Sequence, residues 1–305
     1  MRHFGSTVRT AAICALVTAV SAAAAGCSSP PVRHAAAAGS AAAGGRPAYY
    51  LALGDSLARG VQPDAAGRSL PTDDGYPDRV YAVLRRTQPD LRLVKLGCSG
   101  ETSFTMINGG TCHYRGGSQL AAATSFLRAH RLETSLVTID IGANDPNSCF
   151  LGASLVKIGS CMNSRVRLTV DDLGTILSRL RAAGGPRVRI IGMTYYVPEL
   201  AGWLHGKVGQ AVAVLTERLV LGYNSLLTSE YHHYRARVAN VFGAFHSADF
   251  GDGVRLATYG TVPRNVATVC ELTWACSRPP EQPNEHANTL GYATIARAFL
   301  LADQR

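Results

Sequence analysis

The chain has 305 residues, of which 47% are hydrophobic and 17% charged, a composition that suits a globular protein with a sizeable core. Its formal net charge of +9 does not indicate nucleic-acid binding, because the Lys and Arg residues are scattered. The densest basic runs, Arg85-Arg86 and Arg187-Val188-Arg189, are short. A solvated basic surface is the favoured interpretation, with mild attraction to anionic lipid or cell-wall polymer as a further option.

Residues 1–26 have the features of a signal peptide. Arg2 and Arg9 lie around the start of an apolar run at 11–25, which is short for a transmembrane helix. The run ends in Ala24-Ala25-Gly26-Cys27, which resembles the lipobox of bacterial lipoproteins. We therefore expect an exported protein anchored to the membrane by a lipid on Cys27, or released. An ordinary signal peptide cut at a nearby Ala-x-Ala site is the alternative.

Residues 27–46 are expected to form a flexible tether. They are mostly Ala, Gly, Ser and Pro and show no apolar periodicity, so they cannot bury a core. The folded domain is therefore expected to span residues 47–305.

From residue 48 onward, strand and helix signals alternate along the chain. Short apolar runs predict buried strands at 49–53, 91–96, 136–141, 188–193 and 238–242. Amphipathic stretches predict helices over 76–88, 118–131, 165–183, 207–232 and 288–302. Strands that alternate with helices indicate a parallel sheet covered on both faces. Ligands of such sheets bind beyond the carboxyl ends of the strands.

Three polar motifs follow the first three predicted strands and therefore belong to one edge of the sheet. They are Gly54-Asp55-Ser56, Cys98-Ser99-Gly100 and Gly142-Ala143-Asn144-Asp145. A serine hydroxyl becomes a nucleophile when a base removes its proton. The N–H of Gly100 and the amide of Asn144 can donate to an oxyanion. For each motif alone, a helix cap or a turn is the favoured explanation.

The candidate base is His286, directly before the last predicted helix. The ordered set of Ser56, Gly100, Asn144 and His286 resembles the SGNH/GDSL hydrolase family over about residues 49–303. The resemblance implies a flavodoxin-like three-layer α/β/α sandwich with a five-stranded parallel sheet. It implies Ser56 as nucleophile and His286 as general base, with Ser56 N–H, Gly100 and Asn144 forming the oxyanion hole. It implies no metal or cofactor.

Two details refine this interpretation. The other common serine hydrolase scheme, with Gly-x-Ser-x-Gly in mid-domain, does not fit a serine that follows the first strand. Family members often carry an Asp three residues before the histidine, and here that position is Pro283. A catalytic imidazole needs a partner on its second nitrogen. We expect the backbone carbonyl of Pro283 to be that partner, with Glu281 as the alternative.

Six cysteines lie in the expected domain and fall into three close pairs. An even number in an exported protein indicates disulfides, and the spacing favours Cys98–Cys112, Cys149–Cys161 and Cys270–Cys276. Six cysteines allow fifteen pairings. A zinc site is the weaker alternative, because the chain has no Cys-x-x-Cys pair.

The sequence thus predicts a monomeric serine ester hydrolase. Lipid esters are the first expectation for its substrate, because the anchor would hold the site near a membrane. Deacetylation of a cell-envelope carbohydrate uses the same chemistry and is the second. A non-enzymatic envelope lipoprotein that keeps the fold as a binding module is the third.

Overall fold

The computed structural model describes residues 48–304, except for 151–154 and 281. The expected signal peptide, the tether and the lipidation site Cys27 lie outside these residues, and so does Glu281. None of the helices in the described part is both long enough and apolar enough to cross a membrane.

The centre of the fold is a parallel sheet of five strands. They are β1 (Ala48–Gly54), β4 (Leu91–Lys95), β5 (Thr134–Asp140), β6 (Arg189–Met193) and β7 (Arg237–Ala239). The spatial order is β4-β1-β5-β6-β7, which is the flavodoxin-like order 2-1-3-4-5 in sequence terms. This confirms the expected sheet. The strand order reverses between β1 and β5, and ligands of such folds bind at that switch point.

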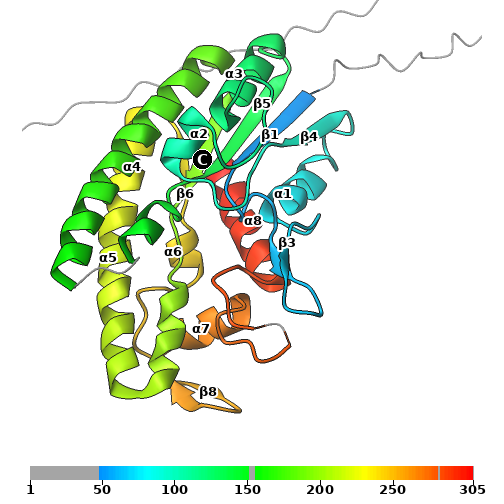
Figure 1. The fold of residues 1–305 in the computed structure, drawn as a ribbon. Helices are drawn as coiled ribbons and strands as arrows, with labels where there is room; N and C mark the ends of the chain where they lie inside the picture. The colour runs from blue at the N-terminus through cyan, green and yellow to red at the C-terminus, as the bar shows by residue number, and fades with distance from the viewer. Residues whose placement is uncertain (1–47, 151–154, 281, 305) are drawn as a thin grey trace, which may run out of the picture. The chain divides into compact units, whose positions relative to one another are not determined.

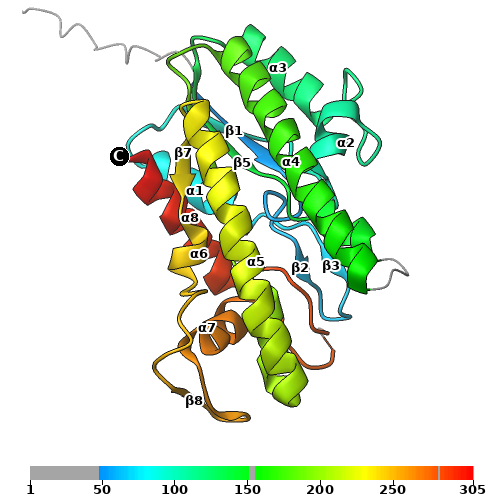
Figure 2. The same ribbon diagram turned by 90° about the vertical axis from the view of Figure 1, so that its left-hand side faces the viewer.

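Helices cover both faces of the sheet, as expected (Figures 1 and 2). One face carries α1 (Tyr76–Leu84) and α8 (Thr289–Asp303), and the other carries α3 (Gln119–Ala129), α4 (Leu155–Gly184) and α5 (Gly206–His233). Between the sheet and the first face, the ring of Tyr76 stacks on Phe299 with centroids 4.5 Å apart. Leu51 and Val137, on adjacent central strands, are fully buried.

The fifth strand is shorter than its apolar run predicted. The run 238–242 was expected to be extended throughout, but β7 ends at Ala239 and α6 (Val241–Ala244) follows. Asn240 causes the change, because its side chain caps α6 by accepting the N–H of Gly243 at 2.9 Å. The N–H of Phe242 is taken by the hydroxyl of Thr194 instead of a strand partner.

Short elements fill the connections. They are α2 (Ser103–Asn108), η1 (Asp145–Phe150), η2 (Pro198–His205), α7 (Arg264–Leu272) and the hairpins β2 (Gln62–Pro63) with β3 (Ser69–Leu70) and β8 (Val254–Leu256) with β9 (Gly260–Val262). Three disulfides join Cys98 to Cys112, Cys149 to Cys161 and Cys270 to Cys276, the pairing expected from the spacing. Disulfides persist in oxidising compartments, which suits an extracellular protein.

Candidate active site

Ser56 lies in a tightly held turn at the carboxyl end of β1. Gly54, two residues before it, has φ +135°, and a Cβ there would collide with the carbonyl of Asp140. The buried side chain of Gln119 holds Gly54 at both polar atoms, accepting its N–H at 2.7 Å and donating to its carbonyl at 2.9 Å. The carboxylate of Asp55 accepts the N–H of Leu57 at 2.9 Å. The backbone around Ser56 is therefore fixed on both sides.

Behind this turn, two buried carboxyl groups face each other. Oδ2 of Asp140 accepts the backbone N–H of Asp55 at 3.2 Å, and its Oδ1 accepts the hydroxyl of Tyr76 at 2.5 Å. Burial is the main cause that raises the pKa of Asp55 to about 6. Burial and then the charge of Asp55 raise the pKa of Asp140 well above its usual range. Burial and the neighbouring carboxylate thus both favour the neutral form of the Asp140 side chain.

The proposed oxyanion donors lie at the ends of the strands on either side of β1. Gly100 follows β4 with φ +79° and is exposed. Asn144 follows β5, and its Nδ2 donates to the carbonyl of Glu101 at 3.0 Å. This hydrogen bond ties the loop after β5 to the loop that carries Gly100.

A second link joins the same two loops. The carboxylate of Asp145 accepts the backbone N–H of Ser103 at 3.0 Å and its hydroxyl at 2.5 Å, at the first residue of α2. Asp145 thus fixes the start of α2 relative to the loop after β5. The disulfide from Cys98 to Cys112 closes the segment that contains Gly100.

His286 is placed by contacts with three elements. Its carbonyl accepts the N–H of Trp274, just after α7. The hydroxyl of Tyr196, just after β6, donates to the carbonyl of Glu285 at 2.7 Å. Three residues beyond His286, α8 begins, and the hydroxyl of Tyr292 on that helix donates to the carbonyl of Val61 at 2.9 Å. The histidine is therefore bound to the same edge of the sheet as the segment that follows Ser56.

The partner of the second ring nitrogen differs from the sequence expectation. Nδ1 of His286 lies 3.1 Å from Oδ1 of Asn284, and the same oxygen accepts the backbone N–H of His286 at 3.0 Å. An Asx turn accounts for this, because an Asn side chain readily accepts the N–H two residues on. Asn284, and not the carbonyl of Pro283, takes the orienting position. Burial lowers the pKa of His286 below its ordinary value, with the charge of Glu285 acting in the opposite sense.

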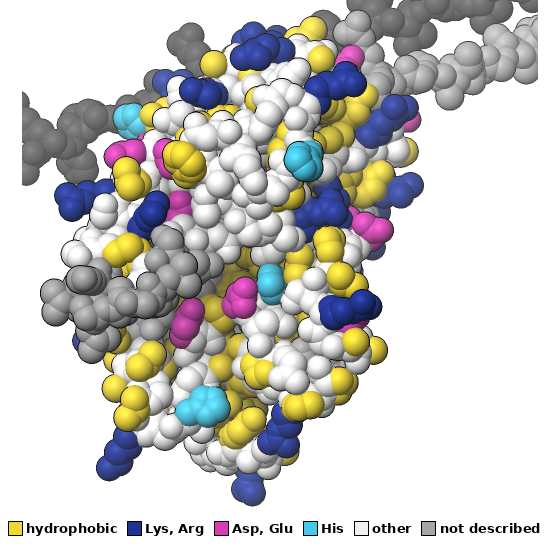
Figure 3. Space-filling view, viewed as in Figure 1, with side chains coloured by type: hydrophobic (Ala, Val, Ile, Leu, Met, Phe, Trp, Pro, Cys, Tyr) yellow, Lys and Arg dark blue, Asp and Glu magenta, His cyan; other side chains and the backbone are white. Residues whose placement is uncertain are grey.

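The arrangement places Ser56, His286 and the expected oxyanion donors around one edge of the sheet. The backbone N–H groups of Ser56 and Gly100 donate no hydrogen bond within the described part of the chain, so both are available to donate to an oxyanion. The hydroxyl of Ser56 and the imidazole of His286 do not hydrogen-bond to each other in the described structure. Contacts of this kind often tighten only when substrate binds. Figure 3 shows the face concerned hollowed, with apolar side chains in the hollow and acidic and histidine side chains beside it.

Sequence reasoning missed the residues that support this site. Asn284 had a local signal, because Asn two residues before a functional side chain is typical of an Asx turn. Gln119 and Asp140 had none, because they act on Gly54 and Asp55 from 65 and 85 residues away. Among the described residues, no group of three or more His, Cys, Asp or Glu side chains is arranged to hold a metal ion.

Comparisons with known proteins agree with this geometry. The sequence model of the GDSL-like Lipase/Acylhydrolase family matches residues 52–293. A search of curated protein sequences gave no match. The structure is similar to an extracellular lipase from Streptomyces rimosus, with TM-score 0.53, 16% identity, and coverage of 84% of this chain and 99% of the lipase. A lipase from a goat rumen metagenome gives TM-score 0.51, 15% identity, and coverage of 84% and 97%. At such low identity, these likenesses establish the fold alone.

Proposed function

The chain belongs to the GDSL-like lipase/acylhydrolase family as a carboxylic ester hydrolase, and we propose that it hydrolyses lipid esters through an acyl-enzyme on Ser56. The observation that supports this assignment of roles is the convergence of Ser56, Gly100 and Asn144 on adjacent strand ends at the switch point of the sheet. The loop of His286 is bound to the same edge.

The reaction then follows in two balanced steps. His286 takes the proton of Ser56 as the hydroxyl oxygen attacks the ester carbonyl carbon, and the oxyanion is held by the N–H groups of Ser56 and Gly100 and the amide of Asn144. The ester C–O bond breaks, and the alcohol leaves with the proton from His286. Water then gives a proton to His286 and attacks the acyl carbon, which releases the acid and returns the proton to Ser56.

The protonation state of His286 suits this role. A general base must be neutral before it accepts a proton, and burial lowers the pKa of this imidazole. The Nδ1 hydrogen bond to Asn284 leaves Nε2 as the nitrogen that accepts the proton of Ser56. A fluorophosphonate probe should therefore label Ser56 alone, and labelling that survives Ser56→Ala would contradict the assignment.

Exposed apolar side chains around the site support a lipid acyl group. Phe104, four residues after Gly100, is 59% exposed, and Leu290, four residues after His286, is 55% exposed. The first half of α5 begins beyond the carboxyl end of β6 and carries Val208 and Leu215, both exposed, on one face. Exposed apolar side chains on segments that extend beyond the carboxyl ends of the strands can contact an apolar ligand.

Nitrophenyl esters of increasing chain length test the proposal. We expect kcat/KM to rise with chain length. Phe104→Ser should lower kcat/KM on decanoyl ester by roughly tenfold, because burying a side chain of this size contributes about 1.5–3 kcal/mol, and should leave acetyl ester unchanged. Leu132→Ser is the matched control, because this side chain is 75% exposed but lies before β5 at the opposite edge.

Other outcomes separate the alternatives. Activity restricted to acetyl esters would favour deacetylation of an envelope carbohydrate by the same residues. A folded protein without esterase activity would favour a binding module.

The lipid anchor is a separate part of the proposal and rests on the sequence Ala24-Ala25-Gly26-Cys27. Labelling of producing cells with an alkyne fatty acid should mark the wild type, and Cys27→Ala should remove the label. A label that persists in this variant would show that the acyl group is attached elsewhere.

A further inference from the structure

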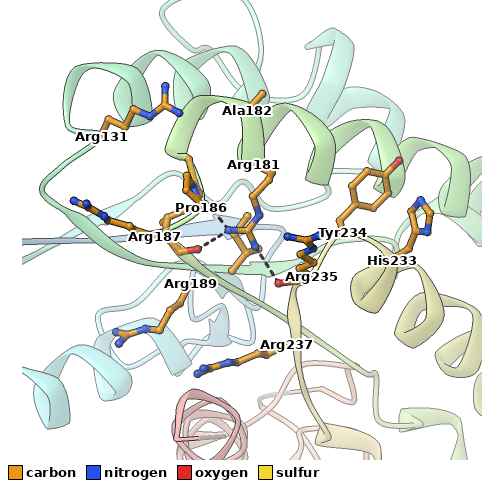
Figure 4. Close-up of a pocket in the computed structure, with 13 residues that line it drawn as sticks. Arg131, Arg181, Ala182, Pro186, Arg187, Arg189, His233, Tyr234, Arg235 and Arg237 are labelled. Carbon is orange, nitrogen blue, oxygen red and sulfur yellow. Dashed lines mark hydrogen bonds between the residues drawn. The ribbon is translucent and has the colours of Figure 1, made fainter.

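A cationic cavity lies at the edge of the sheet opposite to the candidate active site (Figure 4). Its volume is about 580 Å³, and it lies among the connections that lead into β5, β6 and β7. Six arginines line it: Arg131, Arg181, Arg187, Arg189, Arg235 and Arg237. They include both arginines of the basic run 187–189, which the catalytic site does not use.

Only part of this charge is neutralised within the described chain. Asp303 pairs with Arg189 at 2.9 Å and approaches Arg237 at 3.7 Å. No Asp or Glu is among the described residues that line the cavity itself. Counting the arginines against Asp303, six positive charges face one negative charge. An excess of this size in one cavity is a feature of anion-binding sites.

Three of the guanidinium groups have no partner in the described structure. Arg131 precedes β5, Arg187 precedes β6 and Arg235 precedes β7, and none of the three side chains forms a hydrogen bond or ion pair with another described residue. The three adjacent connections thus each present one unpaired guanidinium group. Figure 4 shows the side chains of Arg187, Arg189 and Arg237 spread along the strand starts, with Arg131 above them.

Hydrogen bonds and backbone conformation fix the connections that line this cavity. Arg181 at the end of α4 donates to the carbonyls of Val188 at 2.7 Å and Arg235 at 3.0 Å, which joins two of the connections. Arg235 has φ 55°, a left-handed backbone conformation that residues other than glycine seldom adopt. Gly185 has φ +80°, and a Cβ there would approach Nε of Arg131 within 2.9 Å.

The positive charges of Arg181 and Arg235 repel each other within the cavity. Burial, and then the charge of Arg235, lower the pKa of the Arg181 guanidinium. A bound anion would reduce this repulsion and would pair with the unpaired guanidinium groups. Guanidinium groups present two parallel N–H donors, which match two oxygens of a phosphate group.

We propose that this cavity binds the phosphate groups of a polyanionic ligand. Arg131, Arg187 and Arg235 come from three separate connections, and the cavity of about 580 Å³ has room for more than one phosphate group. The site is independent of ester hydrolysis, since Ser56 lies at the carboxyl edge. The first residue of β1, Ala48, lies at the same edge of the sheet as the cavity, so the length of β1 separates the cavity from Ser56. A free polyphosphate compound and the headgroups of an anionic phospholipid present the same chemistry here.

Calorimetric titration of the full chain with inorganic triphosphate tests the proposal. Binding should weaken roughly tenfold or more for each guanidinium removed, so Arg187→Gln/Arg235→Gln should bind at least a hundredfold more weakly. Arg92→Gln/Arg297→Gln removes the same charge from two exposed positions outside the cavity and should bind like the wild type. Both double variants should keep wild-type activity on a soluble acetyl ester, which separates this test from the proposed catalysis.

Two further arms identify the source of the phosphate. Sedimentation with phosphatidylglycerol vesicles that the cavity variant loses and the control variant keeps would assign a lipid headgroup. Triphosphate binding without vesicle binding would assign a soluble compound. Citrate bound as tightly as triphosphate would contradict a phosphate site. The proposal is overturned if the wild type binds neither triphosphate nor vesicles, or if both double variants bind alike.

Discussion

Asn284→Asp would convert a neutral orienting group into a charged one at almost the same position. Oδ1 of Asn284 lies 3.1 Å from Nδ1 of His286. Asp has the same shape, and it can still accept the N–H of His286 that closes the turn. An opposite charge within about 4–6 Å commonly moves a pKa by about 1–3. Because burial now lowers the pKa of His286, the substitution should raise it from that depressed value.

The pH dependence of kcat/KM on a soluble nitrophenyl ester measures this change. The acid limb reports the pKa of the base in the free enzyme, so it should move upward by about 1–3 pH units in Asn284→Asp. The plateau at alkaline pH should not fall, because a carboxylate stabilises the imidazolium that forms during attack. His286→Ala should abolish turnover.

Two controls separate orientation from charge. Asn284→Ala removes the acceptor and should lower kcat without moving the acid limb upward. Glu285→Gln removes a charge whose effect on His286 is smaller than that of burial, and should move the limb slightly downward. If the limb of Asn284→Asp stays at its wild-type pH while the melting temperature is unchanged, Asn284 does not hold Nδ1 during catalysis.

Three further outcomes are expected. Asn144→Ala should lower kcat by about 10²–10³, as loss of one oxyanion donor does, and steady-state kinetics on the acetyl ester would show whether KM changes instead. Because the pKa of Asp55 is raised to about 6, about 3 kcal/mol of stability present below pH 4 should be lost between about pH 4 and 6, which urea unfolding at pH 4 and 7 would measure; Asp55→Asn should lose less over this range, and an equal loss in both proteins would contradict the raised pKa. Replacing Cys98 and Cys112 by Ser should cost about 3 kcal/mol of unfolding free energy, with lower kcat, and unchanged stability would contradict a structural role for this bond.

The sheet could be predicted from the sequence because its strands are buried on both faces. A strand such as β5 reads as a continuous apolar run, and Gly142 marks its end. These strand ends predict that Ser56 and Asn144 lie at one edge of the sheet. The same rule failed at β7, because Val241 and Phe242 are buried in α6 instead, and burial alone does not distinguish a strand from a short helix.

The details of the site depend on contacts that periodicity cannot reveal. Gln119 was expected on a helix, and it lies at the start of α3. Only the folded structure shows that its side chain hydrogen-bonds to the backbone of Gly54. The arginine cavity had a partial signal in Arg187 and Arg189. Its other members come from separate connections, so the charge looked scattered along the chain although it is gathered in space.

The candidate active site and the arginine cavity therefore lie at opposite ends of the strands. β1 has seven residues, so roughly 23 Å of strand separates Ala48 from the turn that carries Ser56. If anionic vesicles occupy the arginine cavity, the catalytic edge faces away from that surface, and Ser56 acts on esters that arrive from solution or from another surface. Soluble esters should then be hydrolysed at the same rate with and without vesicles. If vesicles slow the reaction in the wild type but not in the cavity variant, the bound surface reaches the catalytic edge, and the separation inferred from the parallel sheet does not hold in the bound state.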